Sequence, residues 1–241
     1  MSGLAESIRN IRNTTCSAVV VAAGSSVRMG EDKLFMKLGG MPVLARTLLA
    51  LHACACVDEI VVVTRAESLE QVAGLCRDYG VLKVSKIVCG GATRTESALA
   101  GLSEIRRGAH IAIIHDGDRP LVTEKIVWDA VHAAELYKAA APAVPVTDTV
   151  KLRENNTVAR TLPREELAAV QTPQAFRPEL IKAALTRAVL SGVSYTDDCA
   201  AAEALGIPVR LTDGSRDNIK ITVPADLELA ESILRRREVQ A

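Results

Sequence analysis

Apolar residues along this chain fall into short runs that alternate with longer segments of helical spacing. Four runs rich in Val, Ile and Ala predict buried strands, at 16–22, 59–64, 84–88 and 111–115. Between them, apolar positions recur with the spacing of a helix over 43–53, 67–79 and 96–105. Repeated strand–helix units of this length predict an α/β fold, with a mostly parallel sheet covered by helices on both faces.

Threonines mark three of the expected helix starts. Thr93, with Glu96 three residues later, fits a capping box, in which each side chain satisfies a backbone N–H of the other residue. Thr123 and Thr196 are two further expected N-caps. The pattern therefore predicts where these helices begin as well as where they lie.

The alternation breaks between about 140 and 175. Residues 139–146 predict a strand, and two short polar strands follow at 149–153 and 157–161, joined by a turn at Asn155-Asn156. A polar hairpin is a poor core element, so we expect a projecting β-arm at about 147–175 that closes over a ligand or exchanges with another subunit. An ordinary surface hairpin is the alternative. Regular elements then resume, at 178–190, 197–205, 208–212 and 225–237.

Composition narrows the class of protein. Only 2% of the 241 residues are aromatic and the formal net charge is zero, which argues against a nucleic-acid partner. The six cysteines show no CxxC spacing, so neither a zinc site nor a disulfide framework is expected. No secretory signal and no apolar run long enough for a membrane span is present, so the cytoplasm is the expected location. Residues 1–15 are read as an N-terminal extension that need not be ordered, before one domain at 16–241.

The loop after the first strand is the first candidate site. It reads Ala22-Ala23-Gly24-Ser25-Ser26-Val27-Arg28-Met29-Gly30 and is followed by Lys33. Small residues at the carboxyl end of a strand let backbone N–H groups approach phosphates, and Arg28 and Lys33 supply positive charge. The loop matches neither a Walker A motif nor GxGxxG, and a flexible loop with two solvated cations is the alternative.

Three more segments carry candidate chemistry. Gly90-Gly91 precedes a helix start, where backbone donors favour anions. The fourth strand ends in His115-Asp116-Gly117-Asp118-Arg119-Pro120: Asp116 is read as orienting a hydroxyl or a hydrated metal and Arg119 as holding a phosphate, or the two as a pair that stabilises a turn. His115 is read as a structural residue. Near the C-terminus only Lys220 is chemically suggestive. Together these segments predict phosphate chemistry on a nucleotide.

Taken in order, the motifs resemble those of the 2-C-methyl-D-erythritol 4-phosphate cytidylyltransferase family. The resemblance covers about residues 17–231 and rests on AAGSSVRMG, GGATRTES, HDGDRP, PVTDTVK, QTPQAF, YTDD and DNIKIT. It implies a single Rossmann-like domain with a mostly parallel, mixed sheet and a projecting β-arm. It also implies a homodimer and Mg²⁺-assisted use of CTP.

The resemblance also implies roles for individual residues. Ala22, Ala23 and Gly24 would contact the nucleotide phosphates and ribose, and Gly91, Arg94 and Ser97 the cytosine and its sugar. Arg28 and Lys33 would stabilise the charge that develops at the α-phosphate. The acceptor would be held by Asp116, Arg119, Thr196 and Lys220, and its phosphate would be reached, in the neighbouring subunit's site, by arm residues Thr149, Arg164 and Thr172.

Some of these residues carry a second role. Arg164 and Lys220 also count among the catalytic residues, and Asp116 among the nucleotide ligands. Mg²⁺, or another divalent cation, would be held mainly by the CTP phosphates, with Asp116 as the candidate protein ligand.

The sequence departs from the family pattern at three places. Asp32-Lys33-Leu34 replaces the usual Pro-Lys-Gln in a loop about two residues shorter. Asp118 stands where a small residue is usual, and Ala92 where some members are acidic. The first departure includes Lys33, the lysine assigned to catalysis. The alignment of Lys33 with the family's lysine depends on its distance to Gly39-Gly40.

The implied reaction moves CMP from CTP to 2-C-methyl-D-erythritol 4-phosphate and releases pyrophosphate. The acceptor phosphate is already anionic near neutral pH, so positioning and electrostatic stabilisation are expected to suffice without a general base. Two alternatives stay open. One keeps CTP but uses another polyol phosphate such as ribitol 5-phosphate, and the other is a non-catalytic nucleotide-binding module.

Overall fold

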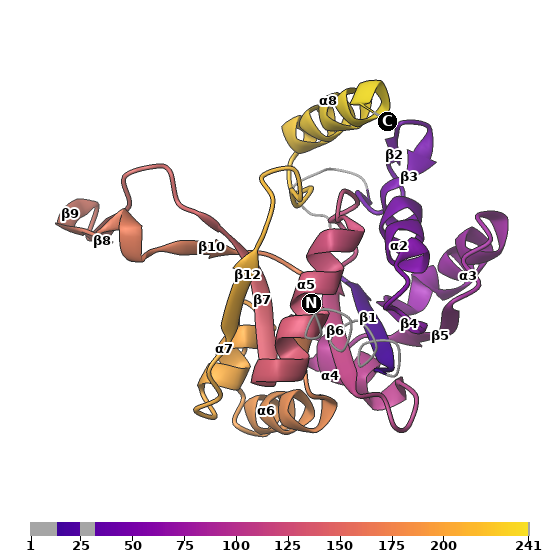
Figure 1. Cartoon of the computed structure of the whole chain (residues 1–241), viewed down its shortest axis with the longest axis horizontal. Coiled ribbons are helices and arrows are strands. Elements are labelled where there is room, and N and C mark those ends of the chain that lie inside the picture. Colours follow the sequence, from indigo (N-terminus) through magenta and orange to yellow (C-terminus); the bar gives the residue numbers. More distant parts are fainter. Residues whose placement is uncertain (1–13, 25–31, 241) are drawn as a thin grey trace, which may run out of the picture.

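The computed structural model describes residues 14–24 and 32–240. Its centre is a twisted eight-stranded sheet with the strand order β10-β7-β11-β6-β1-β4-β5 and β12 beside β7 (Figure 1). The strands are β1 (Cys16–Ala22), β4 (Glu59–Thr64), β5 (Val84–Cys89), β6 (Ile111–Asp116), β7 (Ala139–Pro145), β10 (Ala168–Val170), β11 (Gln174–Phe176) and β12 (Arg210–Asp213).

Most of these strands run parallel to one another. β1 pairs in parallel with both β4 and β6, and β5 and β12 are parallel to their partners β4 and β7. β11 is antiparallel to both β6 and β7, and β10 is antiparallel to β7. Almost every residue of β1, β4 and β6 is buried, because helices cover both faces of the sheet. The expected mixed, mostly parallel sheet is therefore confirmed.

The helices form two layers, one on each face of the sheet. One layer contains α2 (Val43–Ala53), α3 (Leu69–Asp78) and α5 (Glu124–Tyr137), whose apolar residues pack with Val20, Ile60 and Ile113. The other contains α4 (Arg94–Glu104), α6 (Pro178–Leu190) and α7 (Asp198–Glu203), which pack with Val19 and Ile114. Successive residues of a strand point to opposite faces, so one apolar strand contributes to both cores.

Shorter elements and the last helix complete the described chain. α8 (Pro224–Gln240) packs through Ala230 and Ile233 against Leu38 and Leu121, in a third, smaller apolar cluster. Other short elements are β2 (Lys37–Leu38), β3 (Met41–Pro42), η1 (Ala66–Ser68) and η2 (Arg164–Glu166). No helix within 14–24 and 32–240 combines the length and the apolar character needed to span a bilayer.

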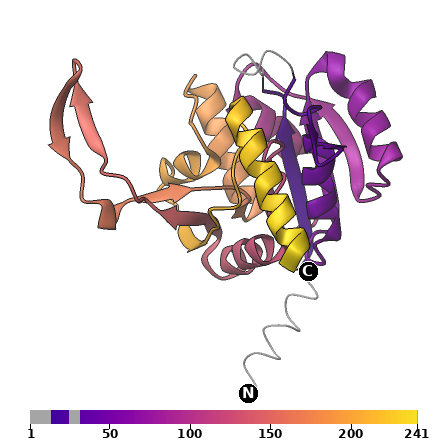
Figure 2. The same cartoon turned by 90° about the horizontal axis from the view of Figure 1, so that it is seen from above.

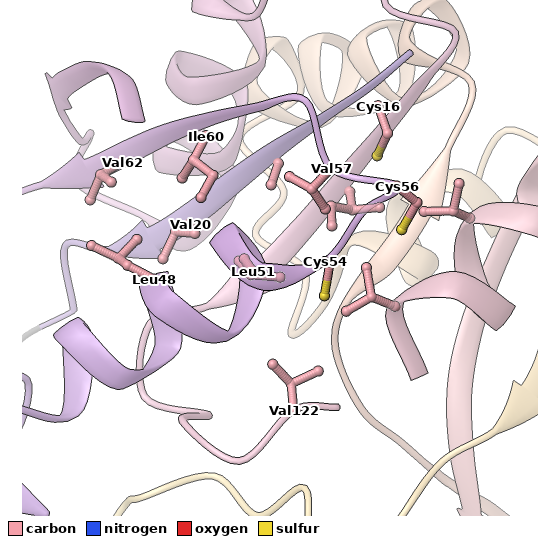
Figure 3. Close-up of a cluster of buried hydrophobic side chains, with 14 of the residues drawn as sticks. Cys16, Val20, Leu48, Leu51, Cys54, Cys56, Val57, Ile60, Val62 and Val122 are labelled. Atoms are coloured by element: carbon pink, nitrogen blue, oxygen red, sulfur yellow. The ribbon is translucent and has the colours of Figure 1, made fainter. Parts of the chain in front are cut away.

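Three cysteines take part in the core beneath α2. Cys16, Cys54 and Cys56 lie among Leu51, Val57 and other aliphatic side chains (Figure 3). Burial is the main reason that the pKa of Cys54 is raised to about 12 and that of Cys56 to about 11. All six cysteines are free thiols, and only Cys89 is exposed. Most of them thus behave as small hydrophobic residues.

The arm projects from the edge of the sheet (Figures 1 and 2). β8 (Lys151–Glu154) and β9 (Thr157–Thr161) form a separate antiparallel hairpin in which every residue is exposed. Asn155 and Asn156 have φ values of 45° and 64°, the left-handed backbone that a tight hairpin turn requires. The last part of the range 147–175 differs from the rest: β10 pairs with β7, and β11 lies within the sheet.

Most predicted elements agree with the structure to within a few residues. The expected capping box is present, since Thr93 Oγ1 accepts from the Glu96 N–H and the Glu96 side chain accepts from the Thr93 N–H. Thr123 is the N-cap residue of α5, as predicted, although its side chain makes no cap hydrogen bond. The prediction for Thr196 was wrong, because α7 is capped by Asp197, which accepts from the Ala200 N–H. The strand β11 was not predicted.

Candidate functional site

The candidate site lies at the topological switch point of the sheet, on either side of which successive strands are added in opposite directions. From β1 the chain continues to β4 on one side, whereas β6 flanks β1 on the other, and Val21 of β1 is paired with Asp116 of β6. Ligands of open α/β sheets bind beyond the carboxyl ends of strands at such a point. A cleft of about 460 Å³ opens here, lined by Val21, Ala22, Ala23, Gly24, Lys33, Leu34, Gly91, Ala92, Thr93, Arg94, Ser97, Asp116, Asp118 and Lys220. Most of the residues predicted for nucleotide binding therefore converge.

Two glycines bring the loop after β5 close to β1. A Cβ atom on Gly90 would lie 2.7 Å from both the Ala23 Cβ and the Ser97 Oγ, so no larger residue fits without displacing them. The Gly91 N–H donates to Ser97 Oγ over 3.2 Å, and the Ser97 hydroxyl donates to the Thr93 carbonyl over 2.9 Å. Ser97 thus fixes this loop at the start of α4, where helix dipole and backbone donors favour an anion.

Charged residues of alternating sign form a chain across the cleft floor. We call this set the ion-pair chain; in order, its members are Lys33, Asp118, Lys220, Asp116, Arg94 and Asp198. The successive nitrogen–oxygen distances are 2.5, 4.0, 3.0, 3.3 and 2.8 Å. The members come from the loop after β1, the end of β6, the segment before α8, and the first turns of α4 and α7. The ion-pair chain therefore joins five segments of the protein that are distant in sequence.

Burial makes these charges depend on one another. Burial alone would raise the pKa of Asp116, but the positive charges of Lys220, Arg94 and Arg119 outweigh it and hold that pKa well below its usual range. Asp198 is 1% exposed, and mainly because of this burial its pKa is raised despite the adjacent guanidinium of Arg94. Burial opposes the charge on Arg94, yet Asp198 and Asp116 raise its pKa overall. Asp116 is therefore a stable anion between cations.

His115 and Thr172 support Asp116 from inside the protein. The Asp116 N–H donates to Thr172 Oγ1 over 3.1 Å, and that oxygen lies 2.9 Å from His115 Nδ1. His115 Nε2 is 3.2 Å from the Arg119 carbonyl oxygen, so both ring nitrogens have partners. Burial lowers the pKa of His115 to about 4. His115 has the structural role predicted for it.

The prediction placed Thr172 on the arm, but in the structure Thr172 does not lie there. It is only 4% exposed, and its hydroxyl serves Asp116 of the same chain. The segment turns back into the sheet at β11, so Thr172 supports the cleft residue Asp116 from within its own subunit. The idea that Thr172 extends toward a neighbouring subunit is corrected here, because the sequence pattern did not reveal β11.

Arg119 braces Asp116 and does not line the cleft. Its Nη1 donates to the Asn218 carbonyl over 2.8 Å, and its Nε lies 3.5 Å from Asp116 Oδ2. Asn218 is fully buried and donates to the carbonyl oxygen of Thr172, which holds the segment that carries Lys220 against the sheet. A role of Arg119 as an acceptor ligand stays a prediction.

Other predicted site residues lie away from this cleft or outside the described chain. Thr149 and Arg164 are exposed near the base of the arm, where Arg164 donates to the Thr147 carbonyl over 3.3 Å. Thr196 is exposed just before α7. Arg28 lies outside the described residues. The roles of these four residues stay predictions.

Sequence reasoning missed three contributors. Asp198 binds Arg94, and Asp118 binds Lys33, although the sequence showed Asp118 only as a departure from a pattern. Gln174 of β11 accepts from the N–H groups of Asp198 and Cys199 over 2.9 and 3.0 Å and so positions the start of α7. The adjacent acids of YTDD were the one available signal, but their burial beside Arg94 is a tertiary property.

Comparison with known proteins gives one consistent result. Residues 16–236 match the family model described as 2-C-methyl-D-erythritol 4-phosphate cytidylyltransferase. The chain is 43% identical over 224 residues to the protein of that name from Halalkalibacterium halodurans, covering 92% of this chain and 98% of the relative. It is also 43% identical over 224 residues to the one from Caldanaerobacter subterraneus, covering 91% and 99%.

Solved structures agree with this result. The crystal structure of 4-diphosphocytidyl-2C-methyl-D-erythritol synthase from Anaerococcus prevotii superposes with a TM-score of 0.83 at 30% identity, over 93% of this chain and 98% of that one. The cytidylyltransferase from Thermus thermophilus gives 0.76 at 34% identity, over 91% and 98%. The chain belongs to the 2-C-methyl-D-erythritol 4-phosphate cytidylyltransferase family.

Proposed function

We propose that this protein transfers CMP from CTP to 2-C-methyl-D-erythritol 4-phosphate and releases pyrophosphate. The observation that carries the proposal is the cleft, in which the small residues Ala22–Gly24 and Gly91 face Lys33, Arg94 and Lys220. Small residues allow close approach of a triphosphate, and the three cations match its charge.

The chemistry is an in-line displacement at the α-phosphorus of CTP. An anionic oxygen of the acceptor phosphate forms the new P–O bond, and the bond from the α-phosphorus to the oxygen bridging to the β-phosphate breaks. The electron pair leaves with pyrophosphate. No proton has to be removed from the nucleophile, so the protein contributes orientation and stabilisation of negative charge.

Lys33 and Lys220 are the described residues best placed to stabilise that charge. Both ammonium groups line the cleft, on either side of the Asp118 carboxylate. Asp116, held as an anion, orients Lys220 over 3.0 Å and Arg94 over 3.3 Å. These cations therefore meet the ligand already oriented, which reduces the reorganisation needed in the transition state.

A divalent cation fits this donor set as a partner of the triphosphate. Within the described residues, no group of three or more His, Cys, Asp or Glu side chains could hold a metal ion. Asp116 accepts one hydrogen bond on each oxygen, from Arg94 and Lys220, and a carboxylate has about four lone-pair sites, so room for one further contact remains. When bound, Mg²⁺ would neutralise triphosphate charge and ease departure of pyrophosphate. Asp116 is the protein residue that would face it.

An acceptor panel tests the function. The purified protein is incubated with CTP, Mg²⁺ and either 2-C-methyl-D-erythritol 4-phosphate or ribitol 5-phosphate, and pyrophosphate release is measured. Release with the first substrate at a clearly higher kcat/KM is expected. Release only with ribitol 5-phosphate would reassign the acceptor, and CTP binding without release from either would indicate a binding module.

We further infer a homodimer formed through the arm, with Arg164 and Thr149 acting at the partner's site. The supporting observations are the exposure of Leu152 and Val158 on the hairpin, 43% and 58%, and the projection of the arm away from the sheet in Figure 2. Sizing in solution tests the dimer. If Arg164 acts on the partner's site, mixing the strongly impaired Lys33→Met and Arg164→Ala proteins restores activity toward about a quarter of wild type. Half of the dimers are then mixed, and one of the two sites in each mixed dimer is intact. No recovery after subunit exchange would place Arg164 elsewhere.

The cytoplasm is the proposed location. Six free cysteines, five of them buried in the folded chain, suit a reducing compartment. Cell fractionation tests this placement.

A further inference from the structure

An ion pair between Lys33 and Asp118 joins two segments that are distant in sequence. The distance from Lys33 Nζ to Asp118 Oδ2 is 2.5 Å, and the two side chains are 14% and 10% exposed. Lys33 follows the loop after β1, and Asp118 is the second acidic residue of HDGDRP, just after β6. Both residues line the cleft. The pair is therefore part of the site itself, not a surface contact.

A third segment fixes the geometry of this pair. The Ile221 N–H donates to the Asp118 carbonyl over 2.9 Å, and Lys33 Nζ donates to the Ile221 carbonyl over 2.9 Å. Ile221 is fully buried in the cluster beneath α8. The ammonium group is consequently held between a side-chain carboxylate and a backbone carbonyl, both of which are anchored to the core.

Asp118 also separates two positive charges. Its Oδ2 contacts Lys33, and its buried Oδ1, which accepts no hydrogen bond from the described residues, lies 4.0 Å from Lys220 Nζ. Without the carboxylate, two ammonium groups in a cleft of limited solvent access would repel each other. A neutral side chain at position 118 would remove the carboxylate that lies 2.5 Å from the Lys33 ammonium and would so weaken the hold on that group.

We propose that Asp118 is a positioning residue, which acts on the reaction by holding the Lys33 ammonium in the cleft at the place where the α-phosphate reacts. The inference rests on the proposed function. The carboxylate supplies an anionic anchor for the Lys33 ammonium. Asp118 contributes through Lys33 and needs no contact with either substrate.

A double-mutant cycle tests the proposal. Asp118→Asn keeps the shape and removes the charge, Lys33→Met removes the ammonium, and the double variant combines them. Asp129→Asn is the matched control, because Asp129 makes an ion pair of the same 2.5 Å length with Lys125 on α5, outside the cleft. The kcat and the KM for CTP are measured by pyrophosphate release. The urea midpoint of each variant is followed by the fluorescence of Trp128, the single tryptophan.

The expected result is a loss confined to the chemical step. Asp118→Asn lowers kcat about 10- to 100-fold, the range for a misplaced catalytic group, and changes the KM for CTP less than about 3-fold. In the Lys33→Met background the same substitution changes kcat less than about 3-fold, because the group it positions is gone. Asp118→Glu, which restores the charge, regains part of the loss, and Asp129→Asn matches wild type.

Two results would overturn the proposal. One is an unchanged or higher kcat for Asp118→Asn, and the other is an equal loss of kcat in the wild-type and Lys33→Met backgrounds. If Asp118→Asn does not fold, Asp118→Ser replaces it, and failure of both to fold would make Asp118 a residue of the fold alone. If the wild-type protein releases no pyrophosphate with any acceptor, the proposed function fails separately. The urea midpoints then test the pair: Asp118→Asn should lower the midpoint of the wild type but not that of Lys33→Met.

Discussion

Replacing Arg94 by alanine removes the one cation that links two buried carboxylates. Arg94 Nη2 lies 2.8 Å from Asp198 and 3.3 Å from Asp116, whose side chains are 1% and 10% exposed. Asp198 is almost fully buried, so loss of the guanidinium leaves its carboxylate without its ion-pair partner. Breaking a buried pair in this way typically costs about 3–5 kcal/mol, because a charge is left uncompensated. Since domains are stable by about 5–15 kcal/mol, the variant should lose a large fraction of its stability.

A second substitution separates charge from packing. Asp198→Asn removes the stranded charge with little change in size, so Arg94→Ala/Asp198→Asn should recover roughly 1–3 kcal/mol of the single variant's loss, the range of coupling between contacting residues. Lys86→Ala is the control for an exposed pair. Lys86 and Glu104 are 2.8 Å apart but 48% and 44% exposed, and such pairs contribute about 0.2–1 kcal/mol.

Urea unfolding followed by the fluorescence of Trp128 measures all four proteins. Trp128 lies on α5 and packs against the core beneath one face of the sheet, so its signal reports on the global transition. A loss below about 1 kcal/mol for Arg94→Ala would refute the reasoning, since the pair would then behave like an exposed one. The same conclusion would follow if Asp198→Asn made the Arg94→Ala protein still less stable.

Three further predictions concern catalysis, pH and packing. Lys220→Ala should lower kcat by about 10²–10³-fold, as does loss of one donor that stabilises transition-state charge, and a wild-type kcat in the pyrophosphate assay would remove Lys220 from that role. Stability should fall as the pH drops from about 6.5 toward about 4, because the unfolded chain binds a proton on His115 that the folded chain does not. The loss of unfolding free energy between these two pH values is about 3 kcal/mol. Urea titrations of His115→Gln at several pH values should lack this part of the pH dependence. Gly101→Ala should destabilise by about 1–3 kcal/mol, because the new Cβ would lie within contact distance of Val19 and 2.6 Å from Val63 Cγ2; an unchanged thermal midpoint would show that α4 can shift away from the sheet.

The parallel core could be predicted because its signals are local. β1 and β4 were expected at their observed bounds, since runs of Val and Ile end at turn-forming or charged residues. Convergence of Lys33, Arg94 and Lys220 at one cleft was also predictable, because the carboxyl ends of parallel strands meet at one edge of the sheet.

The remaining features depend on contacts between distant segments. β11 has only three residues and no detectable period, and it becomes a strand because β6 and β7 leave space between them. Thr196 and Asp197 are both good caps by residue type, and the position of α7 on Gln174 decides in favour of Asp197. Asp198 and Arg94 are 104 positions apart, so no local pattern could pair them.

The residues that line the cleft run from Val21 to Lys220, although all the strands of the sheet end by Asp213. A growing chain can therefore assemble its layered core before it can assemble its catalytic surface. The last lysine arrives with the segment that α8 packs onto the core. A protein cut just after β12 would keep every strand of the sheet in its sequence yet lose Lys220 and both anchors that Ile221 provides. It would also expose Leu38, Val43 and Leu121, which pack beneath α8, so the site and part of the core depend on the same last segment.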